Sequence, residues 1–426
     1  MRITQANWDT NFKSIRESST WNNQVDQELK MHKIHMYPAK FPSFLIGKSL
    51  EYARKNSITV NSIGDIFCGC GTTALEAKVN DKEFWGCDIN PVATLIAKVK
   101  RETYSKNILN KYYENIVTVY TNNYSEIPDY IVQNDRILYW FWPKQIEDLS
   151  QLLNAIKLII PKGKYQDFFL VAFSNILKRS SKWLTKSIKP QIDPAKPIYP
   201  VFESFKSQYI TMLRAVEEIN TKVSNSPNAQ IINRNFLRLN VNESILDMLI
   251  TSPPYVTSYE YADLHQLSTM WLGYTNDFRE LRNGTIGSIY NQSLNNLDIE
   301  GLDEFAIDTY RNLSNADAKS PRAALKYFID MRDTINKSYS LINPGGMAVF
   351  VIGNTTYKDI YIDNAKYLTK CMLNRGFGEI EVMKRKISSK ILSPYRDKRG
   401  KFSNNKNHKK IYSYEFVIIA RKPSNG

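Results

Sequence analysis

The residue types best suited to chemistry stand together in the stretch Thr251-Ser252-Pro253-Pro254-Tyr255. It follows the apolar run 246–250, which predicts a short buried strand. The two prolines fix φ and donate no N–H, so the strand must end here in a stiff loop. Ligands of open α/β sheets bind at this end of a strand. An exocyclic amino group needs hydrogen-bond acceptors, and a flipped base needs a ring to stack on; the loop offers both.

A second candidate site lies nearer the amino terminus. Residues 63–67 predict a buried strand, the turn 68–73 (Cys-Gly-Cys-Gly-Thr-Thr) follows, and a helical pattern continues from Ala74. This order predicts a nucleotide-binding corner, because glycines let the backbone approach a ligand closely. The turn lacks the third glycine of a dinucleotide fingerprint and the Gly-Lys ending of a P-loop. Neither a dinucleotide nor ATP is therefore expected.

The next predicted strand, 83–88, ends in an acid. Asp88 in this position can hold both ribose hydroxyls of a nucleoside. Pro91 suits the first position of the helix that follows. A purely structural interpretation is the alternative: such a glycine-rich turn can be a tight connection, and Ser-Pro-Pro-Tyr can be a strand-ending turn.

Composition and charge narrow the function classes. The chain has 426 residues, and its 57 Lys and Arg against 42 Asp and Glu give a net charge of +15. This balance suits a polyanionic partner such as nucleic acid. The four cysteines and four histidines form no ligand cluster, so neither a metal site nor a disulfide framework is expected. Without a signal peptide or a membrane-length apolar run, the chain is expected to be soluble and intracellular.

Three motifs together resemble the amino-methylating DNA methyltransferases, AdoMet-dependent enzymes that modify cytosine N4 or adenine N6. The motifs are Asp65-x-Phe67-x-Gly69-x-Gly71-Thr72-Thr73, then Gly86-x-Asp88-x-Asn90-Pro91, and finally Thr251-Ser252-Pro253-Pro254-Tyr255. The resemblance implies an α/β, Rossmann-like fold: a mostly parallel seven-stranded sheet with a reversed terminal hairpin. It also implies S-adenosyl-L-methionine (AdoMet) as the cofactor.

The resemblance further implies where the cofactor binds. Residues 35–42 (His-Met-Tyr-Pro-Ala-Lys-Phe-Pro) resemble the segment that packs against the methionine end of AdoMet, and 229–235 resemble the strand beside its adenine ring. There the family usually has Gly-Asp, and this chain has Arg234-Asn235. The expected cofactor-binding residues are Tyr37, Pro38, Lys40, Asp65, Phe67, Gly69, Gly71, Thr72, Thr73, Asp88, Asn90 and Asn235.

A long segment separates the two motif groups. A simple crossover needs only about a dozen residues, so 105–226 is expected to be an inserted, largely helical region. It would divide a cofactor-binding half, 1–104, from a catalytic half with a basic terminal hairpin, 227–426. In the family a segment placed here commonly reads the target sequence; a lid or a dimerisation segment is the alternative. The polar stretch 276–320 is expected to be irregular and could close over the base.

Two basic stretches are candidate phosphate contacts. One lies in the insertion, and the other falls in the turn of the final hairpin, where residues 384–410 carry eleven Lys and Arg against the single acid Asp397. A basic tongue there could track phosphates, or it could be a solvated charge run. The expected DNA-binding residues are Lys178, Arg179, Lys182, Arg396, Lys398 and Arg399.

The motifs predict base flipping followed by methyl transfer to an amino nitrogen. The catalytic residues would be Ser252, Pro253, Pro254 and Tyr255, with the base stacked on Tyr255 and its amino group donating to Ser252 Oγ and the Pro253 carbonyl. Methylation at cytosine C5 is excluded, because no cysteine nucleophile lies near this loop. Since serine at position 252 goes mostly with cytosine N4 in the family, cytosine N4 is favoured and adenine N6 is the alternative.

Other function classes stay open. An RNA or protein-amide methyltransferase would suit the same acceptor loop, and an inactive AdoMet-dependent binding module would show damage in motifs that are intact here. The resemblance implies double-stranded DNA as the partner and a cytoplasmic, nucleoid-associated location. It also allows a cognate restriction endonuclease, within a restriction-modification system. The sequence reveals neither the recognition site nor the number of subunits.

Overall fold

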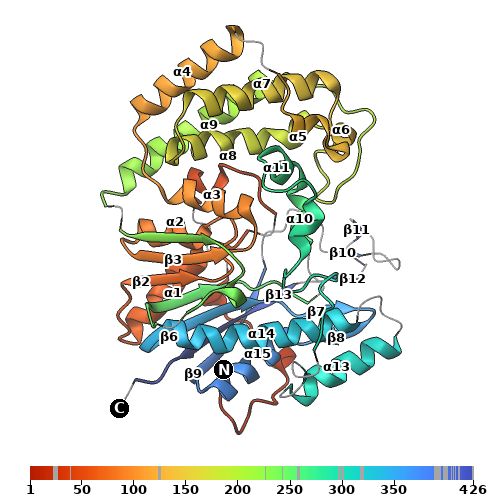
Figure 1. Ribbon diagram of the computed structural model, residues 1–426. Coiled ribbons are helices and arrows are strands. Elements are labelled where there is room, and N and C mark those ends of the chain that lie inside the picture. The colour runs from red at the N-terminus through yellow and green to blue at the C-terminus, as the bar shows by residue number, and fades with distance from the viewer. Residues whose placement is uncertain are drawn as a thin grey trace.

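The structure is a computed structural model, and eight strands form its main sheet in the order β1-β9-β13-β6-β5-β2-β3-β4. It describes residues 1–22, 27–38, 40–122, 126–225, 227–241, 243–256, 260–295, 299, 302–316, 321–387, 395–396, 402–403, 405, 407, 409–410 and 413–424. Figure 1 shows the sheet in the lower half of the molecule and a layer of helices above it.

One half of the sheet is parallel and carries both motif groups. Its neighbouring strands all pair in parallel: β4 (Ala229–Asn233), β3 (Glu83–Asp88), β2 (Ser62–Asp65), β5 (Leu246–Thr251) and β6 (Ile342–Ile352). The carboxyl ends of β2 and β5, which are neighbours, therefore lie at one edge, although their residues are far apart in the sequence.

The other half of the sheet contains the reversed hairpin. β13 (Tyr414–Arg421) lies antiparallel between β6 and β9 (Gly378–Lys386). These seven strands confirm the expected fold class. The two-residue strand β1 (Arg2–Ile3) adds an eighth strand at the outer edge of β9, which was not expected because so short a strand has no sequence pattern of its own.

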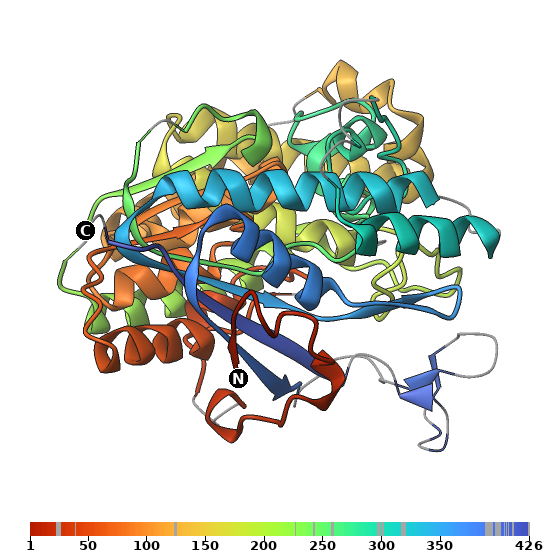
Figure 2. The same cartoon turned by 90° about the horizontal axis from the view of Figure 1, so that it is seen from below.

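Helices cover both faces of the sheet. On β6, Met347, Val349 and Val351 belong to one apolar cluster, and the residues between them belong to another, so the strand is buried on both sides. The first face is covered mainly by α1 (Phe44–Lys55) and α2 (Thr72–Val79). The second face is covered by α13 (Glu304–Asn315), α14 (Pro321–Leu341) and α15 (Asn364–Arg375). Figure 2 shows α14 and α15 along that face.

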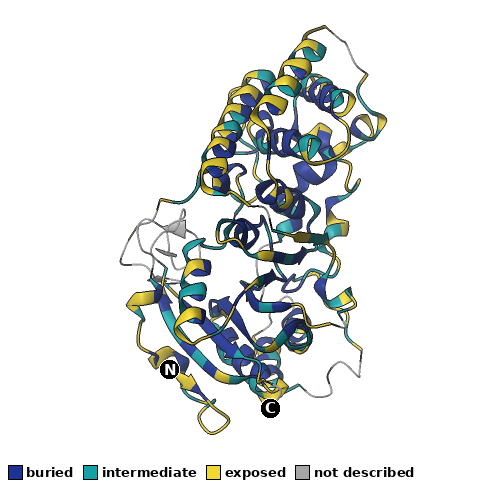
Figure 3. Cartoon of the chain, turned by 90° about the vertical axis from the view of Figure 1, so that its left-hand side faces the viewer, coloured by how far each residue is buried: buried dark blue, intermediate teal, exposed yellow. Residues whose placement is uncertain are grey.

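Six helices that follow α3 (Pro91–Arg101) and precede β4 form the upper layer, which we call the helical layer. They are α4 (Lys106–Asn122), α5 (Asp129–Val132), α6 (Asp135–Trp140), α7 (Pro143–Ile159), α8 (Lys164–Ser180) and α9 (Val201–Lys222). Their apolar side chains form one cluster with residues of α3 and of α11 (Gln266–Trp271). This cluster contains no strand residue and is distinct from the two clusters that cover the sheet, and Figure 3 shows buried residues in both parts of the molecule.

Three stretches differ from the sequence expectation. The sequence predicts one helix that contains Tyr261, His265 and Trp271, and the structure has two short helices, α10 (Tyr261–Leu264) and α11, which meet at His265. The stretch 276–320, expected to be irregular, contains the 3-10 helix η5 (Phe278–Arg282) and α13. The basic stretch begins inside β9, whose strand continues to Lys386, rather than in the hairpin turn.

The remaining elements are small. Single 3-10 turns form η1 (Phe12–Ser14), η2 (Ser19–Trp21), η3 (Lys30–Lys33) and η4 (Phe236–Arg238). The strands β7 (Thr355–Tyr357) and β8 (Ile360–Ile362) pair as a hairpin, and β10 (Tyr395–Arg396), β11 (Phe402–Ser403) and β12 (Lys409–Lys410) form a small sheet, which lies apart from the main sheet in Figure 2. Within the described residues, no helix is both long and apolar enough to span a bilayer.

Candidate active site and cofactor site

The loop after β5 is attached to the end of the neighbouring strand β6. Ser252 Oγ donates a hydrogen bond of 3.0 Å to the carbonyl oxygen of Val351. A serine hydroxyl has one proton and two lone pairs, so a hydroxyl whose proton is engaged in this way can only accept further hydrogen bonds. Pro253 is buried, and no described residue donates to its carbonyl oxygen. Two acceptors are therefore available side by side in the chain.

Tyr255 is held by the same strand end and by the reversed hairpin. Its hydroxyl hydrogen-bonds the backbone of Gly353 and donates to Glu415 Oε2 at 3.5 Å. Glu415 in turn pairs across β9 and β13 with buried Arg385, whose Nη2 lies 2.9 Å from Glu415 Oε1. Burial, followed by the nearby Glu415 carboxylate, raises the pKa of Tyr255 well above its ordinary value. The phenol is therefore neutral at physiological pH.

Asp65, at the end of β2, links this loop to the glycine-rich turn. Its Oδ1 accepts from Thr251 Oγ1 at 2.6 Å and from the Phe67 N–H at 3.1 Å, and its Oδ2 accepts from Thr73 Oγ1 at 2.7 Å. Asp65 is only 3% exposed. Because all three donors are internal, Asp65 and Thr73 position the two loops, and neither side chain points out of the protein toward a ligand.

The glycine-rich turn lies against the end of β3. The Gly69 N–H donates to Asp88 Oδ2 at 2.8 Å. Gly71 adopts φ +77°, and a Cβ built on it would lie 2.6 Å from the Ala97 Cα, so only glycine allows α2 and α3 this close. A Cβ on Gly69 would lie 3.6 Å from the hydroxyl of Tyr37, which places that ring over the turn.

Asn90 connects the acid of β3 with the helix after the catalytic loop. Its Oδ1 caps α3 by accepting from the Val92 and Ala93 N–H groups, so its Nδ2 must be the atom 2.6 Å from His265 Nδ1. The imidazole therefore accepts at Nδ1 and, when neutral, carries its proton on Nε2. Burial lowers the pKa of His265 to about 4, which keeps the ring neutral. The Tyr37 ring packs against it, with centroids 4.9 Å apart.

The structure gathers some of the expected cofactor residues and assigns others to internal bonds. Tyr37, Gly69 and Asp88 meet at the carboxyl edge, next to the half-buried Pro38 and Phe67 and to Thr72, the first residue of α2. Lys40 instead forms an ion pair with Glu28 at 2.8 Å. Asn235 caps η4 through Oδ1 and donates to the Gly284 carbonyl through Nδ2. Its side chain is therefore engaged at both ends.

The residues at the edge fit a nucleoside cofactor. Asp88 accepts one backbone N–H on each carboxylate oxygen, from Gly69 and Asn90, which leaves further lone pairs for hydroxyl donors. Burial raises the pKa of Asp88 above its ordinary value, and the hydrogen bonds from the two backbone donors offset only part of this increase. Asp88 fits the ribose hydroxyls of such a cofactor, and the glycine-rich turn allows the close backbone contact that it requires. The Tyr37 ring offers an apolar surface.

The residues expected to contact DNA lie in different environments in the structure. Lys178 Nζ donates to the Ser187 carbonyl at 2.7 Å, so it binds the loop that follows its own helix, and Lys182 Nζ donates to the Tyr139 carbonyl at 3.3 Å. Arg179 is exposed, with its guanidinium over the Tyr199 ring. Arg396 lies in β10, where the structure describes only the backbone, and Lys398 and Arg399 lie outside the described residues.

Sequence reasoning missed four residues that hold the catalytic loop: Val351, Gly353, Arg385 and Glu415. Arg385 was counted as part of a basic surface stretch, and it is buried in an ion pair instead. A signal for this pair existed, because Glu415 is an acid that directly precedes the apolar run 416–420. The pairing itself depends on strand order, which the local pattern does not contain.

The reversed hairpin beside five parallel strands, with a glycine-rich turn after the central strand, defines the class of Rossmann-like methyltransferases. A family profile described as "DNA methylase", of N6 and N4 specificity, matches residues 2–99. The chain is 24% identical over 419 residues to the Type II methyltransferase M.MvaI of Kocuria varians, which covers 92% of this chain and 90% of that protein. It is also 24% identical over 301 residues to the Type II methyltransferase M.BsoBI of Geobacillus stearothermophilus, covering 63% and 59%.

These matches support a relationship of the chain to the amino-methylating DNA methyltransferases and support AdoMet as its cofactor. Among solved structures, the rRNA methyltransferase aviRa of Streptomyces viridochromogenes has a TM-score of 0.33 at 9% identity, covering 91% of this chain and 88% of that one. A SAM-dependent methyltransferase of Methanosarcina mazei has a TM-score of 0.30 at 10% identity, covering 92% and 99%. Values this low support no conclusion; the strand order defines the fold.

Gly353→Ala should disturb Tyr255 specifically. A Cβ on Gly353 would lie 3.0 Å from Cε2 of the Tyr255 ring, so the ring must move by a few tenths of an ångström. We expect turnover to fall by about tenfold, since small misplacements of reacting groups are costly, while AdoMet affinity stays unchanged. Steady-state kinetics and cofactor titration measure both. Gly378→Ala is the control, because its Cβ meets nothing within 4 Å. Equal turnover in both variants would contradict this role of Gly353.

Asp65→Asn should change how stability depends on pH. Burial raises the pKa of Asp65 to about 6, whereas an unfolded chain releases this proton near about 3.9. Between these values the folded protein holds the proton and the unfolded chain does not. Raising the pH across this interval therefore lowers the free energy of unfolding, by up to about 3 kcal/mol.

The asparagine variant cannot titrate and should lack this part of the decrease. Urea unfolding of both proteins at pH values from about 4 to about 7 measures the difference in slope. If the free energy of unfolding depended on pH in the same way in both proteins, the Asp65 carboxylate would have the same pKa in the folded and unfolded states. Activity is a second readout, because the Thr73 and Thr251 contacts meet at this residue.

Proposed function

We propose that this chain methylates the exocyclic amino group of a flipped base in double-stranded DNA, with cytosine N4 as the target. The observation that carries the proposal is the hydrogen bond from Ser252 Oγ to the Val351 carbonyl. An amino group is a donor, so it requires acceptors, and this bond commits the serine hydroxyl to accepting. The Pro253 carbonyl supplies the second acceptor.

The proposed chemistry consists mainly of orientation. Hydrogen bonds from the amino group to Ser252 Oγ and the Pro253 carbonyl would hold the nitrogen lone pair out of conjugation with the base. The Tyr255 ring, neutral and tethered to Gly353 and Glu415, would provide the stacking surface. AdoMet, when bound, supplies a methyl group that is already strongly electrophilic. Alignment of the nitrogen is then the main task left to the protein.

The cofactor residues in this proposal are those at the shared edge. Asp88 would receive the ribose hydroxyls, Gly69 would give backbone access, and the Tyr37 ring over the turn would cover the apolar side. Asp65 would act indirectly, by fixing the turn and the loop relative to each other. Asn90 and Asn235 would likewise support the site through their caps.

The choice of cytosine rests on Ser252, since serine at this position resembles the cytosine-N4 enzymes; adenine N6 is the second candidate. We further propose that 105–226 reads the target sequence, between a cofactor half 1–104 and a catalytic half 227–426. The two relatives named above are Type II methyltransferases, which supports a restriction-modification role with a cognate endonuclease.

Ser252→Ala should abolish most turnover and spare cofactor binding. A hydrogen bond to a group that gains charge contributes about 1.5–3 kcal/mol, which corresponds to about a 10- to 100-fold loss of rate. Nucleoside mass spectrometry of DNA from expressing cells reads the product, and Ser207→Ala, on the exposed surface of α9, is the control. N4-methylcytosine that disappears only in Ser252→Ala supports the proposal. N6-methyladenine would overturn the base choice, and neither product would redirect the search to RNA or protein acceptors.

Tyr255→Ala should weaken DNA binding and slow catalysis, because it removes a stacking surface worth about 1–3 kcal/mol per base. Tyr255→Phe keeps the ring and loses only the hydroxyl that contacts Glu415, so it should retain most of the DNA affinity. Fluorescence anisotropy with a DNA duplex and isothermal titration with AdoMet separate the two ligands. A variant impaired only in AdoMet binding would place the ring on the cofactor side instead.

A further inference from the structure

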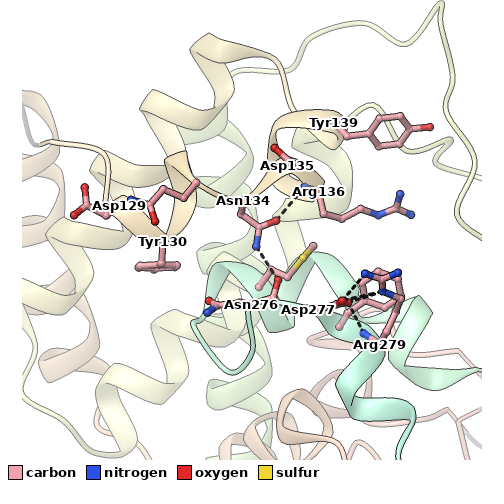
Figure 4. A pocket seen from close by; sticks show the side chains of 12 residues that line it. Asp129, Tyr130, Asn134, Asp135, Arg136, Tyr139, Asn276, Asp277 and Arg279 are labelled. Atoms are coloured by element: carbon pink, nitrogen blue, oxygen red, sulfur yellow. Dashed lines mark hydrogen bonds and ion pairs between the residues drawn. The ribbon is translucent and has the colours of Figure 1, made fainter.

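A pocket of about 890 Å³ lies between the helical layer and the segment that follows α11. One wall comes from α5 and α6, the other from residues 276–279, and Figure 4 shows Tyr139 and Arg136 extending to the same side. We call it the α6 pocket. Its lining residues are Asp129, Tyr130, Gln133, Asn134, Asp135, Arg136, Tyr139, Met270, Asn276, Asp277, Phe278 and Arg279.

Arg136 is anchored by a buried amide. Its Nε donates to Gln266 Oε1 at 2.9 Å, and Gln266 is fully buried. The same oxygen accepts from Trp140 Nε1 at 3.0 Å, while Gln266 Nε2 donates to the Asp263 carbonyl at 2.7 Å. Every polar atom of the amide is thus engaged, which fixes its orientation. The guanidinium is consequently held at one edge, with its two terminal nitrogens left for other partners.

Aromatic rings surround the guanidinium. Its central carbon lies 5.2 Å from the Tyr139 ring centroid, 5.4 Å from that of Trp140 and 5.6 Å from that of Phe278. These are cation–π distances, and they hold an arginine in place without neutralising its charge. The side chain is half-buried, so it has lost much of its freedom before any ligand arrives.

The charge of Arg136 is not compensated. Among the described residues no carboxylate pairs with it, although Arg279 pairs with Asp277 and Arg282 with Asp263. The other acids of the pocket, Asp129 and Asp135, are exposed in the first turns of α5 and α6, where an acid complements the free N–H groups of a helix. A rigid, half-buried and unpaired guanidinium calls for an acceptor pair from outside the chain.

We propose that Arg136 is a DNA contact that presents its terminal N–H groups to two adjacent acceptors, either N7 and O6 of a guanine or the two oxygens of a phosphodiester. Both offer the spacing that a planar guanidinium fork matches, and lysine does not. The inference rests on the proposed function and names a residue through which the helical layer would meet the duplex. Its anchor, Gln266, lies on α11, which follows the catalytic loop and α10.

The experiment compares wild type with Arg136→Gln, Arg136→Lys and the control Arg214→Gln. Arg214 is exposed on α9 and does not line the α6 pocket, so the control makes the same charge change elsewhere in the helical layer. Sequencing that detects methylated bases in DNA from expressing cells gives the motif of each protein. Binding of each to a duplex with that motif, and to one without it, is measured over a range of salt. Thermal unfolding and AdoMet titration confirm that each variant is folded.

A guanine contact predicts that Arg136→Gln and Arg136→Lys both accept other base pairs at one G·C position, with discrimination there lowered by about 5- to 100-fold. A phosphate contact predicts an unchanged motif, weaker binding of Arg136→Gln to both duplexes and a salt slope lowered by about 1, with Arg136→Lys close to wild type. Either result supports the inference. It is overturned if the Arg136 variants match Arg214→Gln in motif, affinity and salt slope. A wild-type protein that methylates no DNA would overturn the proposed function itself, and the inference with it.

Discussion

The buried carboxylate of Asp65 is the contact on which the site depends. It sits at the end of β2, accepts from Thr73 on the cofactor side and accepts from Thr251 at the start of the catalytic loop. Neighbouring parallel strands alone would place the two loops at one edge of the sheet. The shared carboxylate does more, because it sets the distance between them. A carboxylate this deeply buried is costly unless each oxygen is bonded, and here both are.

The end of β6 gives the catalytic loop its shape. Val351 and Gly353, two residues apart, bind Ser252 and Tyr255 respectively. Val351 lies at the end of β6 and Gly353 directly follows the strand, so one short piece of backbone holds two side chains of the loop. Two prolines stiffen the chain between them. The reversed hairpin contributes from the far side, since its Arg385–Glu415 pair reaches the Tyr255 hydroxyl.

Local features were predictable from the sequence, and long-range partners were not. The cap of Asn90, the turn at Gly71 and the strand before Ser252 depend on residues next to one another, and the structure has all three. The partners of Arg385 and Lys178 depend on which strand or loop comes alongside, so both looked like surface charges. The break at His265 has the same origin, because its ring packs between Asn90 and Tyr37, which lie far away in sequence. The roles of the site residues in binding and catalysis stay predictions.

The hydrophobic core of the helical layer is shared with elements outside it. Its apolar residues form one cluster with Val92, Leu95 and Val99 of α3 and with Trp271 of α11, elements that begin just after Asp88 and shortly after the catalytic loop. The layer is therefore not an independent unit that could be exchanged without changes to its neighbours. A segment transplanted from a relative would have to bring matching surfaces for α3 and α11, or leave cavities at the joint. Under the target-reading role proposed for the layer, substitutions at its exposed rim would disturb the packing less than exchange of the whole layer.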